Sequence, residues 1–298
     1  MRRRFVTLDV FTERRFAGNP LAVVLEPQGL GTPQMQAIAR EFNHPETVFV
    51  LPPQDPAHRA RLRIFTPAAE LPFAGHPTVG TAMLLGRLDG GGERRFVVEE
   101  GVGSVSCATT MTDPDSGRAS FALPVLPVEQ GPGPDAGAAA AALALDSTDI
   151  GFDGLRPSRW SAGMAQNFIP VRSLAAIARA QPDPARFAAA FSIDGRDVAY
   201  LYCGEVTEAG HHFHARMFAP GLGVREDPAT GSAAAGFAGL LAASGRYADG
   251  GHMVRIEQGY EMGRPSVIDL ALTMRGGKLA AATVGGGAVV VTEGAIEA

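Results

Sequence analysis

The sequence predicts an α+β fold with two pseudo-symmetric lobes, each a curled, mostly antiparallel sheet around one central apolar helix. An internal repeat is the main basis for this prediction: residues 75–85 and 231–241 both fit Gly-x4-Gly-x-Ala-x-Leu-Leu without a gap. Each copy follows a strand-like segment, at 63–67 in the first half and at 216–220 in the second. Strand-like segments also outnumber helical ones, which disfavours a parallel, doubly wound sheet, because that fold alternates strands with helices.

In the first half, a surface helix is expected over residues 33–42. Pro33 suits a first helical turn and Thr32 can cap it. The first helix of the repeat is expected over 76–88. The remaining segments alternate or are rich in β-branched residues, and they predict strands. These strands cover residues 5–11, 21–25, 48–51, 61–66, 95–100, 102–108 and 118–123.

The second half opens with residues 127–142, which are rich in Pro, Gly and Ala, and their first part is interpreted as a linker. The alanine run from Ala138 predicts a helix start. We therefore expect an N-terminal lobe of residues 1–126 and a C-terminal lobe of residues 127–279, with the option that strands at about 280–298 return to the N-terminal lobe. Further helices are expected over 184–191 and 231–244, strands over 197–203 and 211–218, and a strand-rich end from 253 to 292.

The two repeat helices carry almost no charge, so we expect them to be buried on all sides. Each begins with small residues, which present free backbone N–H groups and the positive end of the helix dipole. Two such helix starts facing each other would form a cleft suited to a small carboxylate. The sequence therefore predicts a small anionic substrate, bound near Gly75 and Gly231.

Composition narrows the class of protein further. The chain has 298 residues, 46% of them hydrophobic and 19% charged, as in a globular protein of about two domains. Its formal net charge is −5 and its only basic run is residues 2–4, so no nucleic-acid partner is expected. No segment resembles a membrane span or a secretory signal, so no membrane partner is expected. Two cysteines, Cys107 and Cys203, offer no disulfide framework, so we expect a cytoplasmic protein in which both are buried and inert.

Two single residues stand at junctions where a loop meets a strand or a helix. Glu46 comes just before an apolar strand and can reach the mouth of a cleft; the alternative is an exposed loop glutamate. His76 lies between Gly75 and Pro77 at a helix start, where it can donate or accept a proton; the alternative is a histidine satisfied by its surroundings. The residues alone leave both alternatives open.

A third polar cluster precedes the second repeat helix. Asp227, Thr230 and Ser232 can each cap that helix, because Asp, Thr and Ser are preferred caps. Capping needs only one of them, however. Three polar groups and Gly231 at one helix start are more than capping requires, and the excess favours a ligand site.

Other motifs point away from cofactors. His212 and His214 share a strand face beside His211, but no carboxylate or cysteine nearby in the sequence completes a metal site, so no metal is expected. The spacing of Gly75 and Gly80 is neither a dinucleotide fingerprint nor a P-loop. A Gly-x-Ser-x-Gly elbow is also absent, which argues against a serine hydrolase.

Taken together, these motifs resemble those of the phenazine-biosynthesis PhzF-like isomerases, which have the diaminopimelate-epimerase-like fold. The similarity runs nearly from end to end of the chain. The segments that carry it are residues 9–12, 16–24, 46–47, 49–50, 63–67, 70–78, 226–233, 258–259 and 262–266.

The resemblance implies two lobes with the active site between them, proton transfer without a cofactor, and a homodimer. It implies that Glu46 is the catalytic acid and base, and that His76, Asp227 and Ser232 are its polar partners around the substrate. Substrate binding would involve Asn19, Gly75, Thr230 and Gly231, with backbone N–H groups near the two glycines holding a carboxylate or an oxyanion.

The chain departs from the family pattern in two places. Pro45 stands where the phenazine enzyme usually has a Ser before its catalytic Glu, so a hydroxyl that could touch the substrate is lost. Ala74 and Thr230 stand about where the amino-acid epimerases have their paired cysteines. A racemase mechanism with two thiols is therefore not available.

The resulting hypothesis is a cofactor-independent isomerase that moves a proton between carbons of a small carboxylate-bearing substrate. Glu46 would take the proton from one carbon and return it at another, for which a closed apolar cleft would raise its pKa. The two helix starts and His76 would hold the developing negative charge. Two alternatives stay open: a non-catalytic binder of a small anionic metabolite, which would not need Glu46, and a cysteine-free epimerase.

Overall fold

The computed structural model describes residues 1–298, apart from the side chain of residue 222. The fold is mixed α/β and dominated by sheet. The chain divides into two compact units: unit 1 comprises Met1–Pro124 and Val284–Ala298, and unit 2 comprises Val125–Thr283. None of the helices among the described residues has the length and apolar character that crossing a membrane requires.

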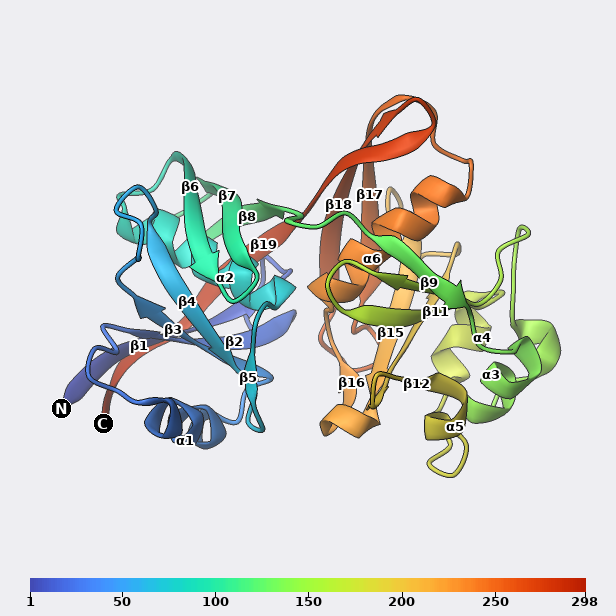
Figure 1. The fold of residues 1–298 in the computed structure, drawn as a ribbon, viewed down its shortest axis with the longest axis horizontal. Helices are drawn as coiled ribbons and strands as arrows, with labels where there is room; N and C mark the ends of the chain where they lie inside the picture. Colours follow the sequence, from blue (N-terminus) through green and yellow to red (C-terminus); the bar gives the residue numbers. More distant parts are fainter. The chain divides into compact units, whose positions relative to one another are not determined.

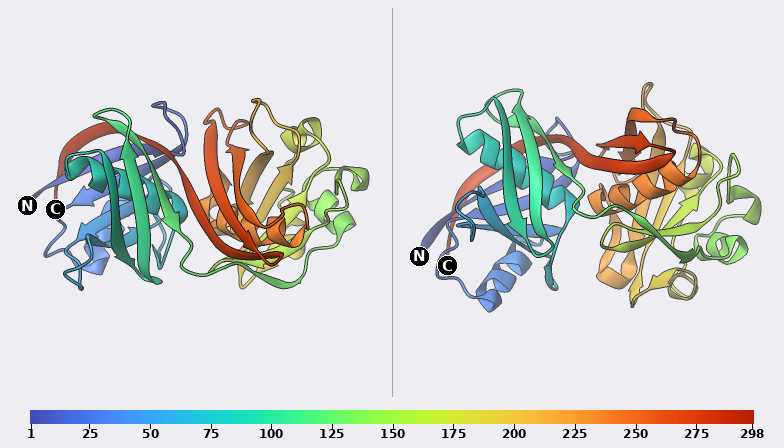
Figure 2. Two further views of the ribbon diagram at one scale, coloured as in Figure 1. Left: turned by 90° about the horizontal axis from the view of Figure 1, so that it is seen from above. Right: turned by 45° about the horizontal axis from the view of Figure 1, so that its top comes forward.

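Unit 1 is a closed ring of eight strands. Closure removes the unpaired edges that an open sheet exposes. The chain termini lie side by side at one end of this unit, where the N-terminal amine donates to the Ala298 carbonyl at 2.7 Å (Figures 1 and 2). The ring runs through β1 (Arg2–Val10), β2 (Asn19–Leu25), β3 (Glu46–Leu51), β4 (Ala60–Phe65), β6 (Glu93–Glu100), β7 (Gly103–Met111), β8 (Ser116–Ala122) and β19 (Lys278–Glu297), and the short β5 (Glu70–Leu71) pairs with β4.

Helix α2 (Gly75–Leu88) lies inside this ring, as its lack of charge predicts (Figure 1). All of it from Gly75 to Gly86 is buried. Gly80 lets the helix approach the sheet closely, since a Cβ there would lie 2.6 Å from both Leu21 and Val10. Helix α1 (Thr32–Phe42) lies outside the ring and buries Met35 and Ala39 against β3 and β4.

In unit 2, eight strands form a row in which β19 follows β18, and helix α6 (Gly231–Ala243) packs against β9, β10, β11 and β18. A second group of helices buries its own apolar cluster against β11, β14 and β15. The row is β9 (Val128–Pro132), β10 (Ser158–Ser161), β11 (Ala165–Pro170), β14 (Ala199–Cys203), β15 (Phe213–Ala219), β17 (Gly250–Gln258), β18 (Ser266–Arg275) and the start of β19. The other elements are α3 (Ala136–Ala142), η1 (Ser147–Asp149), α4 (Leu174–Arg179), α5 (Phe187–Phe191), β12 (Ser192–Ile193), β13 (Arg196–Asp197), η2 (Pro220–Leu222) and β16 (Val224–Asp227).

The strand pairings follow the same order in both units. Along β1, β2, β3, β4, β6 and β7 the successive pairs are antiparallel, parallel, antiparallel, parallel and antiparallel. Along β10, β11, β14, β15, β17 and β18 they are the same. In each unit the repeat helix stands between the fourth and fifth of these strands. The similarity of the two halves therefore extends well beyond the repeated helix motif.

Two expectations about local structure were wrong. The segment interpreted as a linker contains β9, which pairs with β10, so its backbone hydrogen bonds outweigh its Pro- and Gly-rich composition. The cap of α1 is Gly31 rather than Thr32, and the Gln34 side chain accepts a hydrogen bond from the Gly31 N–H at 2.9 Å. The helix predicted from the alanine run is present as α3, and the repeat helices lie where the pattern predicts them.

Candidate active site

Three elements of unit 1 begin at one place. Glu46 is the first residue of β3 and lies opposite Leu21 on the parallel strand β2, which itself begins at Asn19. His76 is in the first turn of α2, and its Nε2 lies 3.4 Å from a Glu46 carboxylate oxygen. The His76 side chain is 5% exposed and that of Glu46 16%. The contact therefore joins a buried imidazole to a carboxyl group that solvent still reaches.

The ionisation of His76 follows from its surroundings. Burial lowers the pKa of His76 to about 3, and a hydrogen bond to the Pro20 backbone offsets this only in part. The ring is therefore neutral near pH 7 and carries a single N–H. Proline offers only a carbonyl, so this N–H donates to Pro20. Because Nε2 has no hydrogen-bond partner in the part of the chain that the structure describes, the proton is on Nδ1, and Nε2 faces Glu46 as a bare acceptor.

The start of α2 has no side-chain cap. Its N-cap residue is Ala74, which has no polar side chain, and its first turn contains no acidic residue. Gly75, the first helical residue, is buried. Backbone N–H groups at such a start are available to an anion.

In unit 2, Asp227 and Thr230 lie in one hydrogen-bond network at the start of α6. The Thr230 hydroxyl donates to an Asp227 carboxylate oxygen at 2.6 Å. Gln258, at the end of β17, donates through Nε2 to the Thr230 hydroxyl at 2.9 Å and to the Asp227 carbonyl at 2.8 Å. Its Oε1 accepts from the Thr230 N–H at 3.1 Å. Gln258 thus fixes both residues.

Capping does not explain this polar cluster. Thr230 is the N-cap residue of α6, yet its side chain makes no capping hydrogen bond because its hydroxyl is turned to Asp227. Gly231 begins the helix and is buried, and Ser232 follows it, partly exposed. The first turn contains no acidic residue. Both repeat helices therefore start without a side-chain cap.

The candidate residues fall into two groups, each within one unit. Unit 1 brings together Asn19, Glu46, Gly75 and His76. Unit 2 brings together Asp227, Thr230, Gly231 and Ser232. Gln258 belongs with the second group and was missed as a site residue, because its partners are about 30 positions away in the sequence. The only signal for it was the Gln258-Gly259 dipeptide in the family resemblance.

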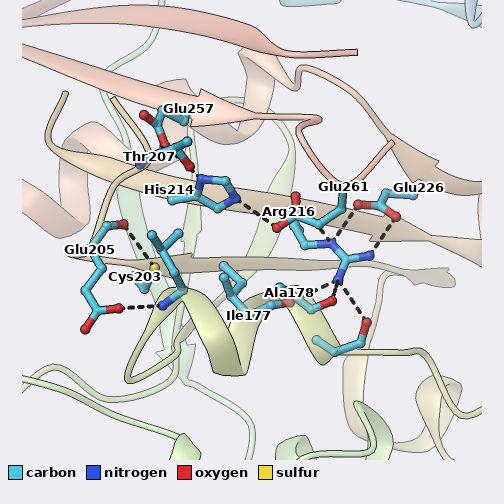
Figure 3. Close-up of polar contacts among 12 residues, drawn as sticks. Ile177, Ala178, Cys203, Glu205, Thr207, His214, Arg216, Glu226, Glu257 and Glu261 are labelled. Atoms are coloured by element: carbon cyan, nitrogen blue, oxygen red, sulfur yellow. Dashed lines mark hydrogen bonds and ion pairs between the residues drawn. The ribbon is translucent and has the colours of Figure 1, made fainter. Parts of the chain in front are cut away.

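The three histidines of β15 and its preceding loop have other partners. His211 and His214 each contact the Glu257 carboxylate through Nδ1 at 2.8 Å. Nε2 of His214 contacts Glu261 at 3.0 Å, and Figure 3 shows both contacts of His214. Burial alone would lower the pKa of His214, but these hydrogen bonds outweigh it and raise the pKa to about 9. The nearby Arg216 forms a two-point ion pair with Glu226. These residues form an ion-pair network in which each ring nitrogen of His214 has a carboxylate partner.

Both cysteines are buried, as expected. Burial raises the pKa of each thiol to about 12, so neither forms a thiolate near neutral pH.

Comparison with known proteins places the chain in a family. Residues 8–294 match the model of the phenazine biosynthesis-like (PhzC-PhzF) proteins. An uncharacterized isomerase of Mesorhizobium japonicum is 49% identical, and a trans-2,3-dihydro-3-hydroxyanthranilate isomerase of Pseudomonas aeruginosa 36%; both alignments cover 98% of each chain. The crystal structure of a PhzF-family protein of Bacillus anthracis superposes with a TM-score of 0.89 at 25% identity, covering 100% of both chains. The chain therefore belongs to the PhzF-like family of isomerases.

Proposed function

We propose that the two groups of residues serve one active site, and that Glu46 there moves a proton between two carbons of a small carboxylate-bearing substrate. The observation that carries this proposal is the 3.4 Å contact between Glu46 and the bare Nε2 of a neutral, buried His76. A carboxyl group beside a neutral acceptor gains a hydrogen bond when it takes up a proton, and it can return that proton afterwards.

The step balances within the substrate. The Glu46 carboxylate accepts a proton from one carbon, and the electron pair of the broken C–H bond shifts through an adjacent double bond. Glu46, now a carboxylic acid, returns the proton to the carbon at the far end of that system. Nothing is oxidised or reduced, so the step needs no redox cofactor.

We propose a role for His76 that differs from the one expected from the sequence. With its N–H engaged by Pro20, the ring has no second proton with which to hold negative charge. It instead accepts a hydrogen bond at Nε2 from the protonated form of Glu46, and so favours that form during the reaction. Negative charge on the substrate is left to the uncapped starts of α2 and α6 and to the polar groups around Asp227.

The relative from Pseudomonas aeruginosa supplies the first substrate to test, trans-2,3-dihydro-3-hydroxyanthranilate. Pro45 offers the ligand no hydroxyl, so the physiological substrate of this chain is expected to differ near Glu46. We propose a small unsaturated acid of the same chemical class.

The test is turnover in D2O with trans-2,3-dihydro-3-hydroxyanthranilate and with a panel of unsaturated and hydroxylated small acids. Mass spectrometry and NMR would follow isomer formation and deuterium incorporation. We expect product with at most one new C–D bond, at the carbon that receives the proton. Calorimetry would show whether any member of the panel binds. If one binds but no compound is isomerised or exchanges a proton, the non-catalytic binder is favoured.

A further inference from the structure

A second carboxyl group lies against the start of α2. Glu100 ends β6 and is 8% exposed, and its Oε1 lies 2.8 Å from the Thr78 hydroxyl. That hydroxyl lies 2.7 Å from the carbonyl oxygen of Ala74, the N-cap residue of α2. Three oxygen atoms therefore form a hydrogen-bonded series from Glu100 through Thr78 to Ala74. Ala74 lies two residues before His76.

Counting the protons in this series of hydrogen bonds bears on the protonation state of Glu100. Two hydrogen bonds among three oxygens need two protons, and the Thr78 hydroxyl supplies only one. A carbonyl oxygen supplies none. Both contacts are satisfied together when Glu100 carries the second proton and donates to Thr78 while Thr78 donates to Ala74. An ionised Glu100 would take the Thr78 proton and leave two oxygen atoms 2.7 Å apart with no proton between them.

Unit 2 has a permanently neutral donor at the matching position. Gln258 ends β17 as Glu100 ends β6, and a glycine follows each of them. A Cβ on Gly101 would lie 2.7 Å from Pro72, and one on Gly259 would lie 2.6 Å from Pro228. Gln258 donates to a threonine hydroxyl at the start of α6, as a protonated Glu100 does at the start of α2. An amide and a neutral carboxylic acid have the same shape and both donate.

The surroundings of Glu100 favour its neutral form. Burial raises the pKa of Glu100 to about 8, although a Thr78 hydroxyl that donated to the carboxylate would lower it. Its Oε2 has no hydrogen-bond partner among the described residues, so a negative charge there would be poorly solvated. The buried Cys107 thiol on β7 stays neutral beside it. Glu100 lines a hollow of about 680 Å³, and the other charged residues that line it are Arg61, Arg63, Glu70 and Glu99.

We infer that Glu100 is a proton-bearing positioning residue, which donates to Thr78 and so holds the Ala74 carbonyl and the first turn of α2, with His76, in place for the proposed proton transfer. The positioning role rests on the proposed function, whereas the protonation state does not. Loss of the proton would loosen the start of α2 and lower turnover at alkaline pH.

The protonation state is tested without a substrate. Infrared difference spectra between pH 6 and 10 should show the loss of the carbonyl stretch of one protonated carboxyl group. This loss should occur at a pH well above that at which glutamate normally ionises. Glu100→Gln should lack this band. The NMR signal of the His76 ring should shift at the same pH in the parent protein and not in Glu100→Gln. The inference would be overturned if the parent protein had no such carboxyl band at pH 6. It would also be overturned if the chemical shift of the His76 ring did not change at the pH where the carboxyl band is lost.

The positioning role is tested by pH profiles with any substrate that the D2O experiment identifies. Glu100→Gln keeps the donor and should turn over without the alkaline decline of the parent. Glu100→Ala and Thr78→Val should lower kcat by about 3- to 10-fold at neutral pH, as expected for one lost hydrogen bond. Glu93→Gln, at the exposed start of β6, is the matched control and should keep the parent profile. An unchanged alkaline decline in Glu100→Gln would refute the positioning role alone.

Discussion

At the scale of single residues, a substitution at Glu46, which contacts His76, distinguishes an enzyme from a non-catalytic binder. Replacing Glu46 by Gln preserves shape and most hydrogen bonding but removes the group that accepts a proton. We expect kcat to fall by about 10²–10⁴-fold, the usual contribution of a general acid–base group, while ligand affinity changes little. Steady-state kinetics and calorimetry with the same ligand measure both quantities.

The thiols provide the control for this experiment. Replacing Cys107 and Cys203 by Ala should leave the rate nearly intact, because both are buried and the proposed step uses no thiolate. Full activity in Glu46→Gln would remove Glu46 from the mechanism. Inactivation by thiol alkylation of a folded protein would instead point to cysteine chemistry.

His76 also makes a prediction about stability. Its pKa is about 3 in the folded protein and 6.5 in the unfolded chain, so only the unfolded chain takes up the proton as the pH falls below 6.5. The His76 contribution is therefore fully present above pH 6.5 and is lost by about 1.4 kcal/mol per pH unit between 6.5 and 3. Urea unfolding at pH 7 and pH 5 should show a smaller drop in His76→Asn than in the parent. Equal drops in both proteins would mean that His76 is already charged at pH 5.

At the scale of elements, the close approach of α2 to its sheet depends on Gly80. A Cβ there would meet the branched side chains of Leu21 and Val10 at 2.6 Å, too near for either to avoid by a small shift. We expect Gly80→Ala to lower the free energy of unfolding by about 1–3 kcal/mol, although alanine is the better helix former. Gly137→Ala, in the exposed part of α3, should be neutral or stabilising, since its Cβ would meet only the Asp135 side chain at 3.2 Å. Urea titrations of the two variants give the comparison, and a neutral Gly80→Ala would show that the sheet adjusts.

How well each element could be predicted depended on the range of its contacts. Helices α2 and α6 were predictable because their burial on all sides leaves a local signature, a long stretch of small and apolar residues. Strand β9 was not, because it is held by pairing with β10 rather than by its own composition. Glu100 was unremarkable in the sequence for a similar reason, since its contact with Thr78 spans 22 positions.

At the scale of the whole molecule, the chain passes between its two units twice. After β8 it enters unit 2 as β9, which pairs with β10, and the last strand, β19, begins beside β18 and ends between β1 and β8. The internal repeat predicted two related halves, and the strand pairings follow the same order in each. The repeat could not show where each half ends, because a strand that crosses between units has the same sequence pattern as one that stays.

The proposed site draws Glu46 and His76 from unit 1 and Asp227 and Ser232 from unit 2, so a double-mutant cycle tests whether the halves act together. Asp227→Asn alone should lower kcat and also weaken binding, because Asp227 holds Thr230 at the start of α6. Residues that serve one step are strongly non-additive, so adding Asp227→Asn to Glu46→Gln should cost far less kcat than it does in the parent. If the two losses simply multiply, with ligand affinity taken into account, the groups act independently and a shared site is wrong. The exposed Glu93→Gln gives the additive baseline when it is combined with Asp227→Asn.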